Sequence, residues 1–394
     1  MRDTRRFVTV VGVIIILVAT AIAASSQSSA LFGGPFSNLT PDQLALFEAG
    51  SDDFQEVEEV EDGLGPVFNE ASCATCHNKP TVGGGSDRLE TRFGRMKDGS
   101  FDPMVEFGGS LLQDHGIGKV GGDNYKPEQV PKEATIVAQR RTTPLFGLGL
   151  VDAVPDSTFE QLARMQARST PETAGRVSMV IDLANKNKFS VGKFGWKAQV
   201  PTLFQFAADA YLNEMGITNP LFPNENCPQG DCSTLASNPA KGLNDDGTGV
   251  QNFANFMTLL APPPRGAITA DVSDGEAIFT SLGCANCHVP VLSTGSHKVK
   301  ALANQKFFPF SDFLLHDMGS LGDGIAQGDA TGKEMRTAPL WGLREINSFL
   351  HDGRAATVEQ AILAHDGQGF DARYKFSKLD EQSKLLLLRF LDSL

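Results

Sequence analysis

Apolar residues recur at helical spacing in several short stretches of this chain, and no series of alternating strand patterns appears. Residues 40–49 form a helical pattern, and residues 274–282 form a short amphipathic one. Residues 380–394 place three leucines on one helical face. Long segments rich in glycine, proline and serine separate these patterns. We therefore predict a mainly α fold with long loops and little sheet.

One apolar run has a different character and lies at the start of the chain. Residues 8–23 are almost entirely apolar, follow three arginines and run into a serine-rich stretch, which is typical of a signal peptide. An uncleaved membrane anchor is the alternative, although a run of about 16 residues is short for a membrane span. We expect residues 1–24 to be a signal peptide and the rest of the chain to be exported to the periplasm.

Two segments of the chain are repeated. The sequence RTTPLFGL at residues 141–148 recurs as RTAPLWGL at residues 336–343, and residues 194–203 are echoed by residues 349–358. Repetition of this kind indicates an internal duplication. We therefore predict two related domains. The cysteine motifs described next indicate that each is a cytochrome c-like haem domain.

Four of the six cysteines fall into two CxxCH motifs, made of Cys73, Cys76 and His77, and of Cys284, Cys287 and His288. Two thiols at this spacing can form thioethers to a haem while the adjacent imidazole binds its iron. A zinc ribbon would need its pairs about 15–20 residues apart, whereas Cys76 and Cys284 are 208 apart (284 − 76). Thioredoxin-like pairs or local disulfides give no reason for a repeated histidine. We predict two covalently bound haem c groups with His77 and His288 as iron ligands.

The remaining sequence features concern the domain boundary, the last two cysteines and the kind of partner the protein could bind. The proline-rich residues 261–265 suggest a boundary between an N-terminal haem domain, residues 25–265, and a C-terminal one, residues 266–394. Cys227 and Cys232 are left over as a pair, and export favours a disulfide between them. The formal charge of −13 argues against nucleic acid as a partner. If a redox partner docks by charge, that partner should be basic or meet a locally positive patch.

Several further segments carry a resemblance to a known family: residues 65–69, 194–198, 213–216, 315–319, 336–343 and 351–355. The mature chain resembles the bacterial di-haem oxidoreductase family. It is more distantly similar to bacterial di-haem cytochrome c peroxidases, to the di-haem enzyme that matures methylamine dehydrogenase and to di-haem rubber oxygenases. The resemblance implies that the N-terminal haem is reactive, that the C-terminal haem transfers electrons, and that a tryptophan lies between them.

The resemblance also suggests what faces each iron opposite its first ligand. His365 stands where the peroxidases usually carry a ligating methionine, so we expect it to bind the second iron, with Met318 and His316 as alternatives. Bis-histidine ligation should lower the potential of that haem relative to histidine–methionine. At the first haem, the position equivalent to His365 is Ala210, which would leave the iron open. The neighbouring Tyr211 and the loop residue His115 are weaker candidates there.

Two residues are implied to take part in the reaction. Glu214 stands where the peroxidases carry a distal glutamate, and a partly desolvated carboxyl group can transfer protons during peroxide cleavage. Trp196 would be the electron bridge. The resemblance also implies a calcium ion near Thr337 and Pro339, although ligation by carbonyl groups leaves no mark on side-chain identity.

The function expected from these residues is peroxide reduction at the first haem, with electrons supplied by a small redox protein and relayed through the second haem. Oxidation or oxygenation of an organic substrate at the open haem is an alternative. A non-enzymatic di-haem electron carrier is another, and it would have two six-coordinate haems.

Overall fold

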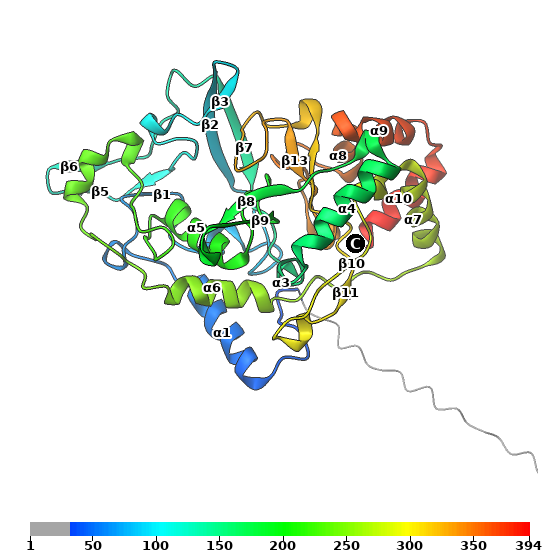
Figure 1. Ribbon diagram of the computed structural model, residues 1–394, viewed down its shortest axis with the longest axis horizontal. Coiled ribbons are helices and arrows are strands. Elements are labelled where there is room, and N and C mark those ends of the chain that lie inside the picture. Colours follow the sequence, from blue (N-terminus) through cyan, green and yellow to red (C-terminus); the bar gives the residue numbers. More distant parts are fainter. Residues whose placement is uncertain (1–31) are drawn as a thin grey trace, which may run out of the picture.

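The computed structural model describes residues 32–394, so the predicted signal peptide lies outside the described residues. Ten α-helices run through it in chain order (Figure 1): α1 (Pro41–Gln55), α2 (Cys73–Cys76), α3 (Leu148–Asp152), α4 (Asp156–Ser169), α5 (Leu203–Met215), α6 (Thr248–Leu259), α7 (Ala270–Leu282), α8 (Val358–Ala364), α9 (Phe370–Ser377) and α10 (Glu381–Asp392). None of the helices in this described part is long and apolar enough to cross a membrane.

Short strands accompany the helices: β1 (Val67–Phe68), β2 (Leu89–Lys97), β3 (Ser100–Asp102), β4 (His115–Gly116), β5 (Gly118–Val120), β6 (Asp123–Tyr125), β7 (Ile136–Arg141), β8 (Ser178–Asp182), β9 (Lys188–Gly192), β10 (Leu292–Ser293), β11 (Lys306–Phe307), β12 (Leu315–Asp317) and β13 (Glu334–Arg336). They form six small sheets, all antiparallel, of which the largest has the order β3-β2-β7.

The predicted fold class was therefore wrong. The protein is a mixed α/β structure, and its described residues do not form two duplicated all-α haem domains. Most of these strands are only two or three residues long, which is too short for an alternating pattern to be recognised, and some longer ones bury polar residues. In β7 the buried positions near its end are Arg140 and Arg141, so the strand lacks the alternation of apolar and polar residues that identifies a half-buried strand.

Helices α1, α7 and α10 form where the sequence predicted helical patterns. Thr40 caps α1 in a capping box with Gln43, and α1 lies along α6 through contacts of Phe54 with two phenylalanines of α6. Helices α7 and α10 lie together at the opposite side of the molecule (Figure 1), where Phe279 and Phe390 have ring centres 5.2 Å apart. The larger core extends across the predicted boundary at residue 265, since it also takes up apolar residues of β10 and β11.

The repeated segments adopt matching local structures and bind one another. The backbone N–H of Arg141 donates to the carbonyl oxygen of His351 at 2.7 Å, and the N–H of Arg336 donates to that of Trp196 at 2.8 Å. Each arginine thus reaches the other copy's segment. The helices α5 and α8 that follow both begin at a capping threonine. The correspondence holds for these segments rather than for whole domains.

Candidate functional site

A cavity of about 350 Å³ lies beside the first CxxCH motif. Cys73 and Cys76 are at the two ends of α2, a single helical turn, and His77 follows directly. Across the cavity lies helix α5, and Trp196 forms part of the wall. The structure thus brings five predicted residues around one space, namely Cys73, Cys76, His77, Trp196 and Glu214.

His77 is oriented as a metal ligand would be. Its Nδ1 lies 3.0 Å from the carbonyl oxygen of Gly84, and because a carbonyl can only accept, Nδ1 carries the hydrogen and Nε2 keeps its lone pair. Burial lowers the pKa of His77 to about 4, so the ring is neutral at pH 7. A neutral imidazole whose other nitrogen donates to a backbone carbonyl is the usual form of a ligating histidine.

The second motif repeats this arrangement. Nδ1 of His288 lies 3.0 Å from the carbonyl oxygen of Phe310, and Nδ1 of His365 lies 2.8 Å from that of Ala361, so both rings keep Nε2 free. The two ring centres are 6.5 Å apart. Two imidazoles that share one metal ion at about 2 Å each would have ring centres about 6 Å apart. The residues present therefore fit an iron held between His288 and His365.

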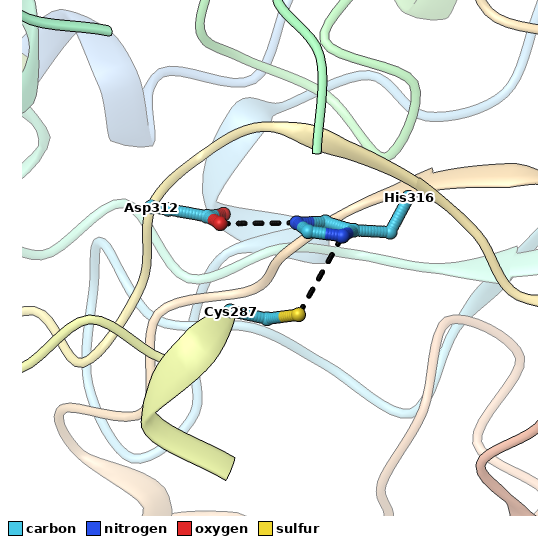
Figure 2. A group of neighbouring side chains, drawn as sticks. All are labelled: Cys287, Asp312 and His316. Atoms are coloured by element: carbon cyan, nitrogen blue, oxygen red, sulfur yellow. Dashed lines mark hydrogen bonds and ion pairs between the residues drawn. The ribbon is translucent and has the colours of Figure 1, made fainter. Parts of the chain in front are cut away.

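His316 has both ring nitrogens engaged elsewhere. Its Nε2 lies 3.0 Å from Oδ2 of Asp312, and its Nδ1 lies 3.5 Å from Sγ of Cys287. Figure 2 shows the ring pointing toward both groups. Although burial opposes the charge, the Asp312 carboxylate raises the pKa of His316 well above its usual value, and the pair is a buried ion pair. The three donor atoms lie within 4.8 Å of one another, as in a metal site. Thioether formation would remove the Cys287 thiolate from such a site.

Met318 lies beside His365 rather than in its place. The methyl group of Met318 and the ring of His365 both come within 3.3 Å of the point where a Cβ on Gly369 would stand. Of the three predicted candidates, the structure brings His365 opposite His288.

Glu214 faces the first cavity from the end of α5. Burial is the main reason why its pKa is raised to about 7, and the negative charge of Glu90 adds to the effect. The amide of Asn69 donates to its Oε2 at 2.8 Å, and the backbone N–H of Asn69 donates to the Glu214 carbonyl oxygen at 2.7 Å. A second carboxyl group on α5, that of Asp209, has its pKa raised to about 6, again mainly by burial. The site therefore holds carboxyl groups that can exchange protons near neutral pH.

The other candidates at the first site lie as follows. Ala210 lines the cavity and offers no ligand atom. The Tyr211 hydroxyl group donates to Glu58 at 2.7 Å. His115 is exposed on β4, where its ring lies 5.4 Å from that of Phe68.

Trp196 touches both halves of the chain. Its indole N–H donates to the carbonyl oxygen of Arg141 at 2.9 Å, its ring lies edge-on to His351, and its own carbonyl oxygen accepts from Arg336 on β13. The sequence analysis did not predict a role for Asn69, although it noted the segment that contains this residue. It also missed the arginines that line the cavity, among them Arg140 and Arg141.

Two structural predictions have different outcomes. The Cys227–Cys232 disulfide is confirmed. The carbonyl oxygen of Thr337 accepts hydrogen bonds from Ser311 and Arg336, and the calcium ion stays a prediction.

Comparison with known proteins gives a family. The family model described as "Di-haem oxidoreductase, putative peroxidase" matches residues 112–394. Among solved structures, the chain is similar to hydrazine synthase of Kuenenia stuttgartiensis (14% identity, TM-score 0.38, 100% of both chains). It is also similar to a MauG-like protein associated with microbial copper homeostasis (14% identity, TM-score 0.39, 92% of this chain and 91% of the other). No curated protein matches it.

Proposed function

The chain belongs to the di-haem oxidoreductase family, and from that premise we propose that it is a periplasmic enzyme that reduces hydrogen peroxide. Family membership makes it a haem-dependent oxidoreductase. The proposal adds the substrate, the compartment and the covalent attachment of both haems, with electrons coming from a small redox protein.

The residues that would hold the two groups are the two CxxCH motifs. Cys73 and Cys76 would attach the first haem, beside His77, and the second motif would attach the other between His288 and His365. When bound, haem would supply reversible one-electron chemistry and a place for a small oxidant. Ala210, the position that corresponds to His365, lines the cavity and offers no ligand atom to the first site.

Glu214 carries the proposal. Reduction of one peroxide to two waters consumes two electrons and two protons, and cleavage of the O–O bond is easiest when one oxygen loses its proton and the other leaves as water. A general acid–base group performs this transfer best when its pKa lies near the working pH. Glu214, buried beside the cavity with a pKa of about 7 and oriented by Asn69, meets that requirement.

Trp196 is assigned the transfer of electrons between the two halves. Its side chain lines the first cavity, and its backbone carbonyl oxygen accepts a hydrogen bond from Arg336 of β13. Its indole hydrogen bond to Arg141 keeps the ring in one orientation.

Steady-state turnover with hydrogen peroxide and an artificial electron donor tests the proposal. We expect Glu214→Gln to lower kcat by roughly 10²–10⁴, the usual contribution of a general acid–base. Asp209→Asn is the matched control, because it neutralises another buried carboxyl group of the same helix and cavity, and it should retain most of the activity. Equal turnover of wild type and Glu214→Gln would contradict the assignment. Absence of any peroxide turnover, together with no cyanide binding, would instead indicate an electron carrier.

A further inference from the structure

The wall of the first cavity contains two adjacent buried arginines at the end of β7. Arg140 is 2% exposed and Arg141 is 9% exposed, and both line the cavity. Nη2 of Arg140 and Nε of Arg141 are buried without a hydrogen-bond partner in residues 32–394. Donors of a buried guanidinium group are normally satisfied, because leaving one unmatched is unfavourable. The two arginines therefore have more donors than the surrounding protein has acceptors.

The carboxylate next to this pair is already shared. Asp323 accepts from Nε of Arg140 at 2.7 Å and from Nζ of Lys197 at 2.9 Å. Arg141 forms no ion pair within the described chain, and its side chain donates only to the backbone carbonyl of Ser348. A positive charge thus borders the cavity without an anion of its own.

Comparison with the repeated segment at residues 336–343 shows that, within the described residues, the unpartnered arginine is found only in the first copy. In that segment Arg336 occupies the position of Arg141, and its Nε donates to the carbonyl oxygen of Gly195 at 2.6 Å. Its guanidinium group also lies over the ring of Phe313, at 5.4 Å. The same position is therefore satisfied within the protein in one copy, whereas Nε has no acceptor in the other.

A guanidinium group presents a planar fork of N–H donors that matches the two oxygens of a carboxylate. Attachment of a haem at Cys73 and Cys76 would bring two propionate carboxylates into this cavity. We propose that Arg141, supported by Arg140, binds a propionate carboxylate of the haem held at the first motif. Because the carbonyl oxygen of Arg141 also accepts from the indole of Trp196, the same residue would place that carboxylate close to the tryptophan.

This inference rests on the first haem site of the proposed function, but not on peroxide turnover. The test uses the holoprotein and the variants Arg141→Gln and Arg141→Lys. Arg88→Gln is the matched control, because Arg88 lines the same cavity but is more than half exposed and already paired with Glu70. The midpoint potential of each haem is measured by spectroelectrochemical titration between pH 5 and 8, and the propionate vibrations are recorded by resonance Raman spectroscopy.

We expect Arg141→Gln to lower the potential of one haem, because loss of a nearby positive charge favours the ferric state. It should also make that potential depend on pH near neutrality, because a propionate without its cation titrates at higher pH. Arg141→Lys should keep most of the potential but shift the propionate band, since lysine cannot reproduce the bidentate geometry. Arg88→Gln should change neither.

Potentials and pH dependence of Arg141→Gln that match those of Arg88→Gln would overturn the inference. If Arg141→Gln does not accumulate, an unshifted propionate band in Arg141→Lys would overturn it. A benzoate-induced spectral change in wild type that Arg141→Gln abolishes, with unchanged potentials, would also overturn it by showing a site for free carboxylates. A chain without haem at the first motif would contradict the proposed function itself.

Discussion

Replacing Glu214 with glutamine should make the protein more stable and less active at pH 8. Glutamine keeps the size of the side chain and an oxygen that can accept from Asn69, whereas it removes the ionisable group. The pKa of Glu214 is raised in the folded chain because burial disfavours the carboxylate. An ionised Glu214 is therefore a destabilising feature that the proposed activity requires.

The magnitude follows from the shift from 4.5 to about 7. One pKa unit corresponds to about 1.4 kcal/mol, so full ionisation destabilises the folded chain by roughly 3–3.5 kcal/mol. Between pH 4.5 and 7 the folded chain keeps a proton that the unfolded chain has released. The free energy of unfolding therefore falls as pH rises through this window, and the loss is nearly complete by about pH 8.

Guanidinium chloride unfolding of the holoproteins at pH 4.5 and pH 8 measures the difference. Relative to wild type, Glu214→Gln should gain roughly 3 kcal/mol at pH 8 and close to nothing at pH 4.5. Asp209→Asn should show the same direction and nearly the same gain at pH 8, because the pKa of Asp209 is raised by a similar amount, from 3.8 to about 6. A Glu214→Gln variant with the same free-energy difference at both pH values would refute the reasoning.

Three other substitutions test separate parts of the structure. His365→Ala should convert one low-spin haem to high-spin while His316→Ala does not, which optical and magnetic spectra distinguish; the reverse outcome would move the ligand to His316. Asn69→Leu removes a hydrogen bond that favours ionised Glu214, so the acid limb of the kcat profile should move to higher pH, and an unmoved limb would deny Asn69 that role. The double variant Cys227→Ser and Cys232→Ser, which lacks the disulfide, should have a free energy of unfolding about 2 kcal/mol lower, measured in denaturant, and unchanged haem spectra.

The sequence was informative where a single short segment determines the geometry. A CxxCH motif is complete within one turn, so the position of His77 and His288 directly after each cysteine pair follows from the local sequence, and their role as iron ligands stays a prediction. His365 was predicted as a ligand by resemblance, and the structure brings it opposite His288 because α8 ends there. The disulfide was predicted because only two cysteines remained.

Contacts between distant segments were not predictable in the same way. The pairing of β2 with β7 joins residues 42 to 52 apart (136 − 94 and 141 − 89), and the buried positions of β7 include Arg140 and Arg141, so no apolar alternation marked that strand. Asn69 meets Glu214 across 145 residues of sequence. Arg140 and Asp323 are 183 residues apart. Their association depends on the assembled fold, and the sequence offers no local signal for it.

The electron paramagnetic resonance spectrum of the ferric holoprotein tests the central claim most directly, namely two haems of which the first has an open iron. The account predicts one high-spin and one low-spin ferric signal in equal amounts, with cyanide converting the high-spin signal alone. Two low-spin signals that cyanide leaves unchanged, or a preparation without ferric haem signals, would contradict it.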